Sequence, residues 1–346
     1  MPSQYLKVGV IGIGRIAQAA HLPALTKAEG VRLVGISDPN RFIVDTVAEH
    51  YSVPGFTDPA LLLAEDVDAV IVAAPDRFHL PLAMHALKAG KHVLVEKPIG
   101  LTVTEGQALV DMAAERGLLL QVGSMRRHDP GIAFAKAHLA SIGPIMSAQY
   151  WYRVMNTLRT ATEDTFFPPI VMDPGVRATE NSFKAERSRY LLLTHGAHVF
   201  DTMRNLSGDL SSVQVCSTQV GTDYSWHGIG RLANTGGLLS FELSANVHST
   251  WSEGFDLFGS KGSIEIRTPF PFTRQASTVR VFTEDTLAAA VPEFGAADPY
   301  RRQLEYFAQA IAQGLPAYPD GADGVKAVRL MDAVAASATV GSRVVV

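Results

Sequence analysis

The chain has 346 residues, of which 47% are hydrophobic and 18% charged, and its formal net charge is −4. This length favours two domains, and a mildly acidic balance without a lysine- or arginine-rich block argues against a nucleic-acid partner. A single cysteine excludes an intrachain disulfide, and the sequence has neither a signal-peptide pattern nor an apolar run long enough to span a membrane. We therefore expect a soluble, cytoplasmic protein with no nucleic-acid or membrane partner.

Short apolar runs alternate with amphipathic stretches over the first 122 residues. The predicted strands are 7–11, 31–36, 69–73, 92–95 and 118–122, and the predicted helices are 15–27, 41–51, 79–88 and 103–116. Continuous apolar runs are typical of strands buried on both faces, and their alternation with helices predicts a doubly wound parallel sheet. We therefore expect an α/β Rossmann domain over residues 1–123.

Strand patterns of period 2 replace this alternation in the rest of the chain. Strands are predicted at 146–154, 212–220, 238–247, 255–258, 263–267 and 278–282, with helices at 130–140, 195–206, 300–313 and 324–338. This order predicts an α+β domain over residues 124–346 with a large, mostly antiparallel open sheet; the last helices are candidates to pack back on the first domain. Residues 156–190 are predicted to form one long loop, of a length typical of functional or disordered segments.

A glycine-rich turn follows the first predicted strand. Gly12 permits a tight turn, and Gly14 lets the backbone approach a pyrophosphate. Arg15 and Ile16 open the next helix, whose first N–H groups would face the phosphates, and Ala17 is small enough for that helix to pack on the strand. The alternative is a purely structural turn, but the surrounding strand–helix order favours a dinucleotide site.

The second predicted strand ends at Asp38, about where an acid should bond the adenosine ribose hydroxyls. A carboxylate at this point would repel the 2′-phosphate of NADP. NAD is therefore the favoured cofactor, although Arg41 close by leaves dual use open.

Lys97 lies at the carboxyl end of the predicted strand 92–95, the edge where open α/β sheets bind ligands. Beside a bound nicotinamide, a partly desolvated lysine could take the proton of a substrate hydroxyl as hydride leaves the carbon. Pro98 forces Lys97 toward an extended conformation, and a cis bond is one way of fixing this turn. A lysine at the end of a strand is, taken alone, more often simply solvated.

Four motifs together resemble the glucose–fructose oxidoreductase/inositol dehydrogenase (Gfo/Idh/MocA) family: GIGRIA at 12–17, AAPDRFH at 73–79, AGKHVLVEKP at 89–98 and SMRRHDP at 124–130. The resemblance implies an N-terminal Rossmann domain and a C-terminal open sheet that forms a wall of the substrate site and often an oligomer interface. It also implies reversible NAD(P)-linked oxidation of a sugar or polyol hydroxyl, with Lys97 as general acid/base. The residues then expected to border the cofactor, besides those of the phosphate loop, are Ala74, Pro75, His79, Glu96 and Lys97.

The segment 194–201 matches a family motif with one departure. The family pattern is Asp-x-Gly-x-His-x-x-Asp, and His198 and Asp201 fit it, but Thr194 replaces the first Asp. A threonine can hydrogen-bond a substrate hydroxyl but cannot act as a base near neutral pH. The proton relay is therefore expected to rest on Lys97 with His198, with His195 as a candidate helper.

Substrate contacts are predicted less directly. The candidates are Arg127, Trp151, Arg153, Tyr190 and His195. Aromatic side chains on strands are more often core or interface residues than ligands, so a structural role is the alternative for Trp151 in particular. No metal-ligand spacing stands out, and we expect no metal.

Taken together, the sequence predicts an NAD(H)-dependent oxidoreductase that acts on a secondary hydroxyl of a sugar, glycoside or cyclic polyol. A homodimer or homotetramer through the C-terminal sheet is expected. Two alternatives stay open: a glycoside hydrolase or lyase that retains NAD and oxidises its substrate transiently, and a non-catalytic dinucleotide-binding regulatory protein. The loss of the leading Asp at position 194 favours the second alternative, and the presence of Lys97 and His198 argues against it.

Overall fold

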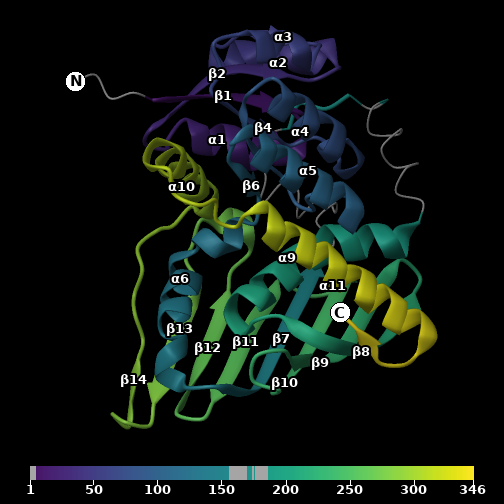
Figure 1. Ribbon diagram of the computed structural model, residues 1–346, viewed down its shortest axis with the longest axis vertical. Helices are drawn as coiled ribbons and strands as arrows, with labels where there is room; N and C mark the ends of the chain where they lie inside the picture. The colour runs from purple at the N-terminus through teal and green to yellow at the C-terminus, as the bar shows by residue number, and fades with distance from the viewer. Residues whose placement is uncertain (1–4, 156–169, 174, 176–185) are drawn as a thin grey trace. The chain divides into compact units, whose positions relative to one another are not determined.

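The computed structural model describes residues 5–155, 170–173, 175 and 186–346, so that most of the predicted loop over 156–190 lies outside the described residues. Contacts divide the chain into two compact units, neither of them contiguous in sequence. The first comprises residues 1–124, 167–187 and 300–328, and the second comprises 125–166, 188–299 and 329–346. Each unit is built around its own sheet (Figure 1).

The sheet of the first unit has six parallel strands in the order β3-β2-β1-β4-β5-β6. The strands are β1 (Leu6–Ile11), β2 (Val31–Ser37), β3 (Gly55–Phe56), β4 (Ala69–Val72), β5 (His92–Val95) and β6 (Leu120–Val122). Every residue of β4 is buried, as expected for a strand covered on both faces. The predicted doubly wound parallel sheet is confirmed.

Helices connect these strands. They are α1 (Leu22–Leu25), α2 (Arg41–Tyr51), α3 (Pro59–Ala64), α4 (His79–Lys88) and α5 (Val103–Arg116). The last of these is capped by the Thr102 side chain at its start and ends at Gly117, whose φ of 64° suits a residue without a Cβ atom. The bounds predicted for α2, α4 and α5 are confirmed, whereas the short β3 and α3 are not among the predicted elements.

The second unit contains a nine-stranded sheet in the order β14-β13-β12-β11-β7-β10-β9-β8-β15. Its strands are β7 (Ile145–Met155), β8 (Leu210–Val220), β9 (Asp223–Leu232), β10 (Leu238–Val247), β11 (Ser252–Gly259), β12 (Gly262–Thr268), β13 (Thr278–Thr283), β14 (Ala288–Ala290) and β15 (Val344–Val345). All neighbouring pairs are antiparallel except β7 and β10, which run parallel. The predicted large, mostly antiparallel sheet is confirmed.

Helices α6 (Pro130–Ala137) and α9 (Arg187–Ser207) lie across one face of this second sheet (Figure 1). Side chains along the strands alternate accordingly: in β9 the buried positions are Trp226, Gly228, Gly230 and Leu232. A Cβ atom at Gly228 would lie 2.3 Å from the Phe241 ring, so this strand carries glycine where a large neighbour fills the inner face. The two glycines remove the apolar alternation from the sequence, which is why β9 was not predicted.

The predicted start of the helix 195–206 is wrong, because α9 begins at Arg187, so that residues 187–190 of the predicted loop are helical. Leu191, Leu192 and Leu193 are buried, and this packing extends the helix by two turns before the histidines. The last helices are α10 (Pro299–Gln313) and α11 (Gly321–Val340), and α11 contributes residues to both units. Among the described helices, none combines the length and apolarity needed to cross a bilayer.

Candidate active site

The loop after β1 has the geometry of a phosphate cradle. Gly12 has φ of 89°, and a Cβ atom there would lie 2.5 Å from the backbone nitrogen of Ala74, so only glycine fits this close approach. A Cβ atom at Gly14 would meet no atom within 4 Å, which leaves the backbone open to a bound group. Helical turns over residues 15–21 lead into α1, with Arg15 and Ile16 half-buried at their start. These residues fit a dinucleotide pyrophosphate.

Asp38 directly follows β2 and is fixed by two backbone donors. Its Oδ2 accepts a hydrogen bond from the backbone nitrogen of Ile13 at 2.9 Å, and its Oδ1 accepts one from that of Asn40 at 3.0 Å. The carboxylate therefore joins the phosphate loop to the start of α2. Arg41, whose presence near Asp38 left the use of NADP as a second cofactor open, lies on the surface 3.5 Å from the carboxylate of Asp45.

Lys97 directly follows β5, in a turn held by a buried histidine. The Lys97–Pro98 peptide is cis. His79 Nδ1 lies 2.6 Å from the carbonyl oxygen of Pro98, and His79 Nε2 lies 2.8 Å from that of Ala74. Since Gly12 packs against Ala74, a continuous set of contacts links the phosphate loop, the end of β4 and the Lys97 turn. Of the residues predicted to border the cofactor, Pro75 is exposed in the loop after β4.

Glu96, which stands between β5 and Lys97, is 5% exposed. Its Oε1 lies 2.7 Å from Nε2 of the fully buried His21, and its Oε2 accepts a hydrogen bond from the backbone nitrogen of Lys97 at 3.2 Å. Burial raises the pKa of Glu96, but the hydrogen bond and charge of His21, together with the charges of Lys97 and His79, outweigh it and hold that pKa below its usual value. Glu96 thus carries a buried charge that holds the backbone of the Lys97 turn.

In the second unit, Thr194, His195 and His198 are half-buried in the middle of α9. Asp201 lies on the same helix and is buried, and it pairs with Arg127 through two hydrogen bonds, from Nε at 2.9 Å and from Nη2 at 2.8 Å. This bidentate pair joins α9 to the short helix 125–128. The Arg127 side chain, predicted to contact substrate, is 3% exposed and committed to this pair.

His195 belongs to a cluster of rings. Its ring centroid lies 5.9 Å from that of Tyr152, which lies 5.0 Å from that of Trp251. Trp251 was not predicted as a site residue, because it lies in the connection between β10 and β11 and no motif marks it. Tyr190, which was predicted to shape the pocket, is half-buried in the first turn of α9.

Trp151 and Arg153 lie on the other face of the sheet, because neighbours along β7 alternate. Trp151 Nε1 donates to the Ser252 hydroxyl at 3.1 Å, and Arg153 forms a half-exposed ion pair with Glu242 at 2.5 Å. The structure therefore brings His195 together with Tyr152 and not with Trp151 or Arg153.

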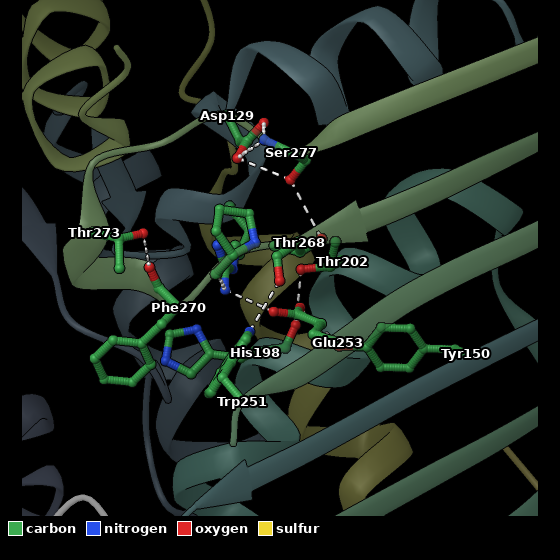
Figure 2. A network of polar contacts seen from close by, with 12 residues as sticks. Asp129, Tyr150, His198, Thr202, Trp251, Glu253, Thr268, Phe270, Thr273 and Ser277 are labelled. Atoms are coloured by element: carbon green, nitrogen blue, oxygen red, sulfur yellow. Dashed lines mark hydrogen bonds and ion pairs between the residues drawn. The ribbon is translucent and has the colours of Figure 1, made fainter. Parts of the chain in front are cut away.

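A buried polar network supports the Trp251 ring (Figure 2). The Arg126 guanidinium lies 5.7 Å from the ring centroid and donates to Glu253 Oε2 at 2.6 Å, while Tyr150 donates to Glu253 Oε1 at 3.0 Å. Trp251 Nε1 itself donates to the carbonyl oxygen of Thr268 at 2.9 Å. The network fixes one ring of the cluster that includes His195.

Models of one protein family match both parts of the chain. Residues 6–124 match the Gfo/Idh/MocA model described as an oxidoreductase family with an NAD-binding Rossmann fold, and residues 182–346 match its C-terminal alpha/beta domain.

Several curated proteins are similar in sequence. The inositol 2-dehydrogenase of Rhizobium meliloti is 24% identical over 343 residues, which cover 96% of each chain. Inositol 2-dehydrogenase 1 of Saccharopolyspora erythraea is 29% identical, over 95% of this chain and 92% of its own length. The scyllo-inositol 2-dehydrogenase (NAD(+)) of Bacillus subtilis is 32% identical over 136 residues, and this match spans only 40% of that relative, as does a 37% match to a Salmonella typhimurium oxidoreductase.

Solved structures share the fold. A levoglucosan dehydrogenase in complex with NADH and levoglucosan has a TM-score of 0.81 at 22% identity and covers 99% of this chain and 100% of its own. The matches to both family models show that the chain belongs to the Gfo/Idh/MocA oxidoreductase family, with an NAD-binding Rossmann fold at its N-terminal end.

Proposed function

We propose that the protein is an NAD(H)-dependent dehydrogenase that transfers hydride between the nicotinamide and a secondary hydroxyl or ketone of a sugar, glycoside or cyclic polyol. The observation that carries this proposal is the set of contacts from Gly12 through Ala74 and His79 to the Lys97 turn. A protonatable side chain is thereby held at the same sheet edge as the cofactor cradle. The inositol dehydrogenases similar to this chain over nearly their whole length support the substrate class.

Lys97 is the proposed general acid/base. When bound, the cofactor supplies the two-electron hydride acceptor. Lys97 takes the proton of the substrate hydroxyl during oxidation and returns it during reduction, which is the role that a positioned amine can fill. Glu96 and His79 are positioning residues, since they bond the backbone of the turn that carries Lys97.

The second unit is proposed to bind and orient the substrate. His198 orients the reacting oxygen, Thr194 hydrogen-bonds a neighbouring hydroxyl, and His195 and Tyr190 contact the substrate. The placement of all four residues on α9 supports this assignment, since helix spacing puts positions 194 and 198 on one face. His195 and Trp251, which are half-buried and both neighbour the buried Tyr152 ring, add aromatic surface suited to a sugar ring.

The test is an assay with NAD and a panel of inositols, monosaccharides and anhydrosugars, monitored by absorbance at 340 nm. We expect steady NADH production with at least one member, and a much smaller rate with NADP because of Asp38. Binding of NADH by fluorescence without turnover of any panel member would favour the regulatory alternative. Product formed without released NADH would favour the NAD-retaining hydrolase or lyase.

We also propose that the protein forms a homodimer or homotetramer through the open face of the second sheet. Ile229, Leu238 and Phe258 are each about half exposed on strands of this sheet, among ion pairs such as Arg267 with Asp256. Such a mixed apolar and charged face is suited to a self-complementary interface. Light scattering should give a multiple of the 37.2 kDa chain mass, and Ile229→Glu should lower it.

A further inference from the structure

Residues 170–173 contact the cofactor cradle of the first unit, although they lie about 130 residues further along the chain than Asp38. The segment clusters with the first unit, and its four residues are half-buried. None of them belongs to a helix or a strand, so hydrogen bonds to the cradle hold them in place.

The first anchor is Gln18, which is 8% exposed at the end of the phosphate loop. Its amide pairs with both backbone groups of Val171: Nε2 donates to the Val171 carbonyl at 2.9 Å, and the Val171 nitrogen donates to Oε1 at 2.8 Å. The same Nε2 also donates to the carbonyl oxygen of Ile13 at 2.8 Å. Val171 is therefore joined to the phosphate loop through one buried side chain.

The second anchor is Asn40, whose Nδ2 donates to Asp173 Oδ2 at 3.0 Å. Asn40 and Ile13 are also the two residues whose backbone nitrogens donate to the Asp38 carboxylate. The anchors at Val171 and Asp173 therefore flank Asp38, the acid expected to bind the adenosine ribose.

We propose that residues 170–173 form a strap that closes the adenosine-ribose end of the cofactor site and slows the release of NAD(H). This inference rests on the proposed function for the cofactor site, and it adds Gln18, Asn40, Val171 and Asp173 as positioning residues for that cofactor. Gln18 and Asn40 each use one side chain both to shape the cradle and to hold the strap, so that cofactor binding and strap docking favour each other.

The test measures the dissociation rate of NADH by stopped-flow fluorescence, with the full-length chain and no substrate. Val171→Pro removes the backbone N–H that donates to Gln18, and Val171→Ala is the matched control that keeps it. Loss of one such hydrogen bond should raise the dissociation rate about five- to tenfold in Val171→Pro, with Val171→Ala within about twofold of wild type.

A second variant addresses the other anchor and guards against a local folding defect. Asn40→Ser keeps an oxygen to cap α2 at the Ile43 nitrogen, yet loses the longer amide arm whose Nδ2 donates to Asp173, and should also release NADH faster than wild type. Unchanged or slower release in both Val171→Pro and Asn40→Ser would overturn the strap while leaving the cofactor site intact. Failure of the wild-type protein to bind NADH would instead overturn the proposed function, and this inference with it.

Discussion

Glu96 in the first unit and Glu253 in the second are both buried glutamates, yet their pKa values shift in opposite directions. Burial is the largest influence on each and raises the pKa of both. Around Glu96, His21, Lys97 and His79 outweigh burial, and the pKa falls below its usual value. Around Glu253, Arg126 and the Tyr150 hydroxyl do not outweigh it, and the pKa rises.

The two carboxylates therefore have different roles. Glu96 keeps its charge where it holds the backbone of the Lys97 turn, close to three groups that carry or can carry a proton. Among the residues that the structure describes, Glu253 has one cationic partner, Arg126, and it belongs to the network that supports the Trp251 ring. We therefore expect changes around Glu96 to affect chemistry most, and changes around Glu253 to affect stability most.

The largest effect should follow removal of the Lys97 amine. Lys97→Met should lower kcat by about 10³-fold, because general acid/base catalysis of this kind contributes roughly 10²- to 10⁴-fold. NADH binding should stay within a few fold of wild type by fluorescence titration. Lys88→Met, at an exposed lysine of α4, is the control and should behave as wild type. A Lys97→Met variant with more than a tenth of the wild-type kcat would contradict the assignment.

In the second unit, removing Arg126 should destabilise the fold. Arg126→Met leaves the buried Glu253 without its cation, and such a loss costs about 3–5 kcal/mol in the free energy of unfolding. Urea denaturation should show a clear drop in midpoint. Arg153→Met breaks a half-exposed ion pair with Glu242 and should cost at most about 1 kcal/mol. Equal losses in the two variants would remove the distinction between the buried and the exposed pair.

The two glutamates should also differ in how pH changes their contribution to stability. A lowered pKa means that the contribution of Glu96 is present above the usual glutamate value of 4.5 and is lost as pH falls through the folded-state pKa. A raised pKa means that the contribution of Glu253 is present below 4.5 and is lost as pH rises through its folded-state pKa.

Melting temperatures of wild type, Glu96→Gln and Glu253→Gln between pH 4 and pH 8 test this contrast. The advantage of wild type over Glu96→Gln should shrink on acidification, and its advantage over Glu253→Gln should shrink as pH rises. Both effects should be smaller than that of Arg126→Met. Slopes of the same sign for both variants would show that the two environments do not differ as described.

The smallest effects are expected from substitutions of tryptophans on the two faces of the second sheet, and their effects on kcat/KM should differ. Trp251→Phe removes the bond to Thr268 beside the His195 cluster, and should lower kcat/KM about tenfold. Trp151→Phe changes a ring on the opposite face and should leave kcat/KM within about twofold. Steady-state kinetics with the best panel substrate provides both numbers, and a larger effect at Trp151 would place the substrate elsewhere.

The first unit could be predicted from the sequence in most of its detail. Its strands are continuous apolar runs, so the end of each run could be recognised. This predicted that Asp38 and Lys97 lie at the carboxyl edge of the parallel sheet. Contacts between residues far apart in the chain could not be predicted, because neither partner carries a local signal. The pairing of His21 with Glu96 spans 75 residues, and that of Gln18 with Val171 spans 153.

The second unit was harder to predict for physical reasons. Glycines at inner positions removed the apolar alternation of β9, since Phe241 fills the space beside Gly228 and Leu210 fills the space beside Gly230. The start of α9 lies before the predicted residue 195, because packing of its leucines extends the helix back to Arg187. Trp251 is positioned by tertiary contacts with Tyr152 and Arg126, and no spacing in the sequence predicts these contacts.

The most direct test of the central claim counts carbonyl product and released NADH in the same reaction. A purified sample with excess NAD and a panel substrate should form one ketone for each NADH released, over many turnovers. The Lys97→Met variant should form neither product at a comparable rate. Product that accumulates without released NADH, or NADH formation that does not depend on the substrate, would contradict a net dehydrogenase.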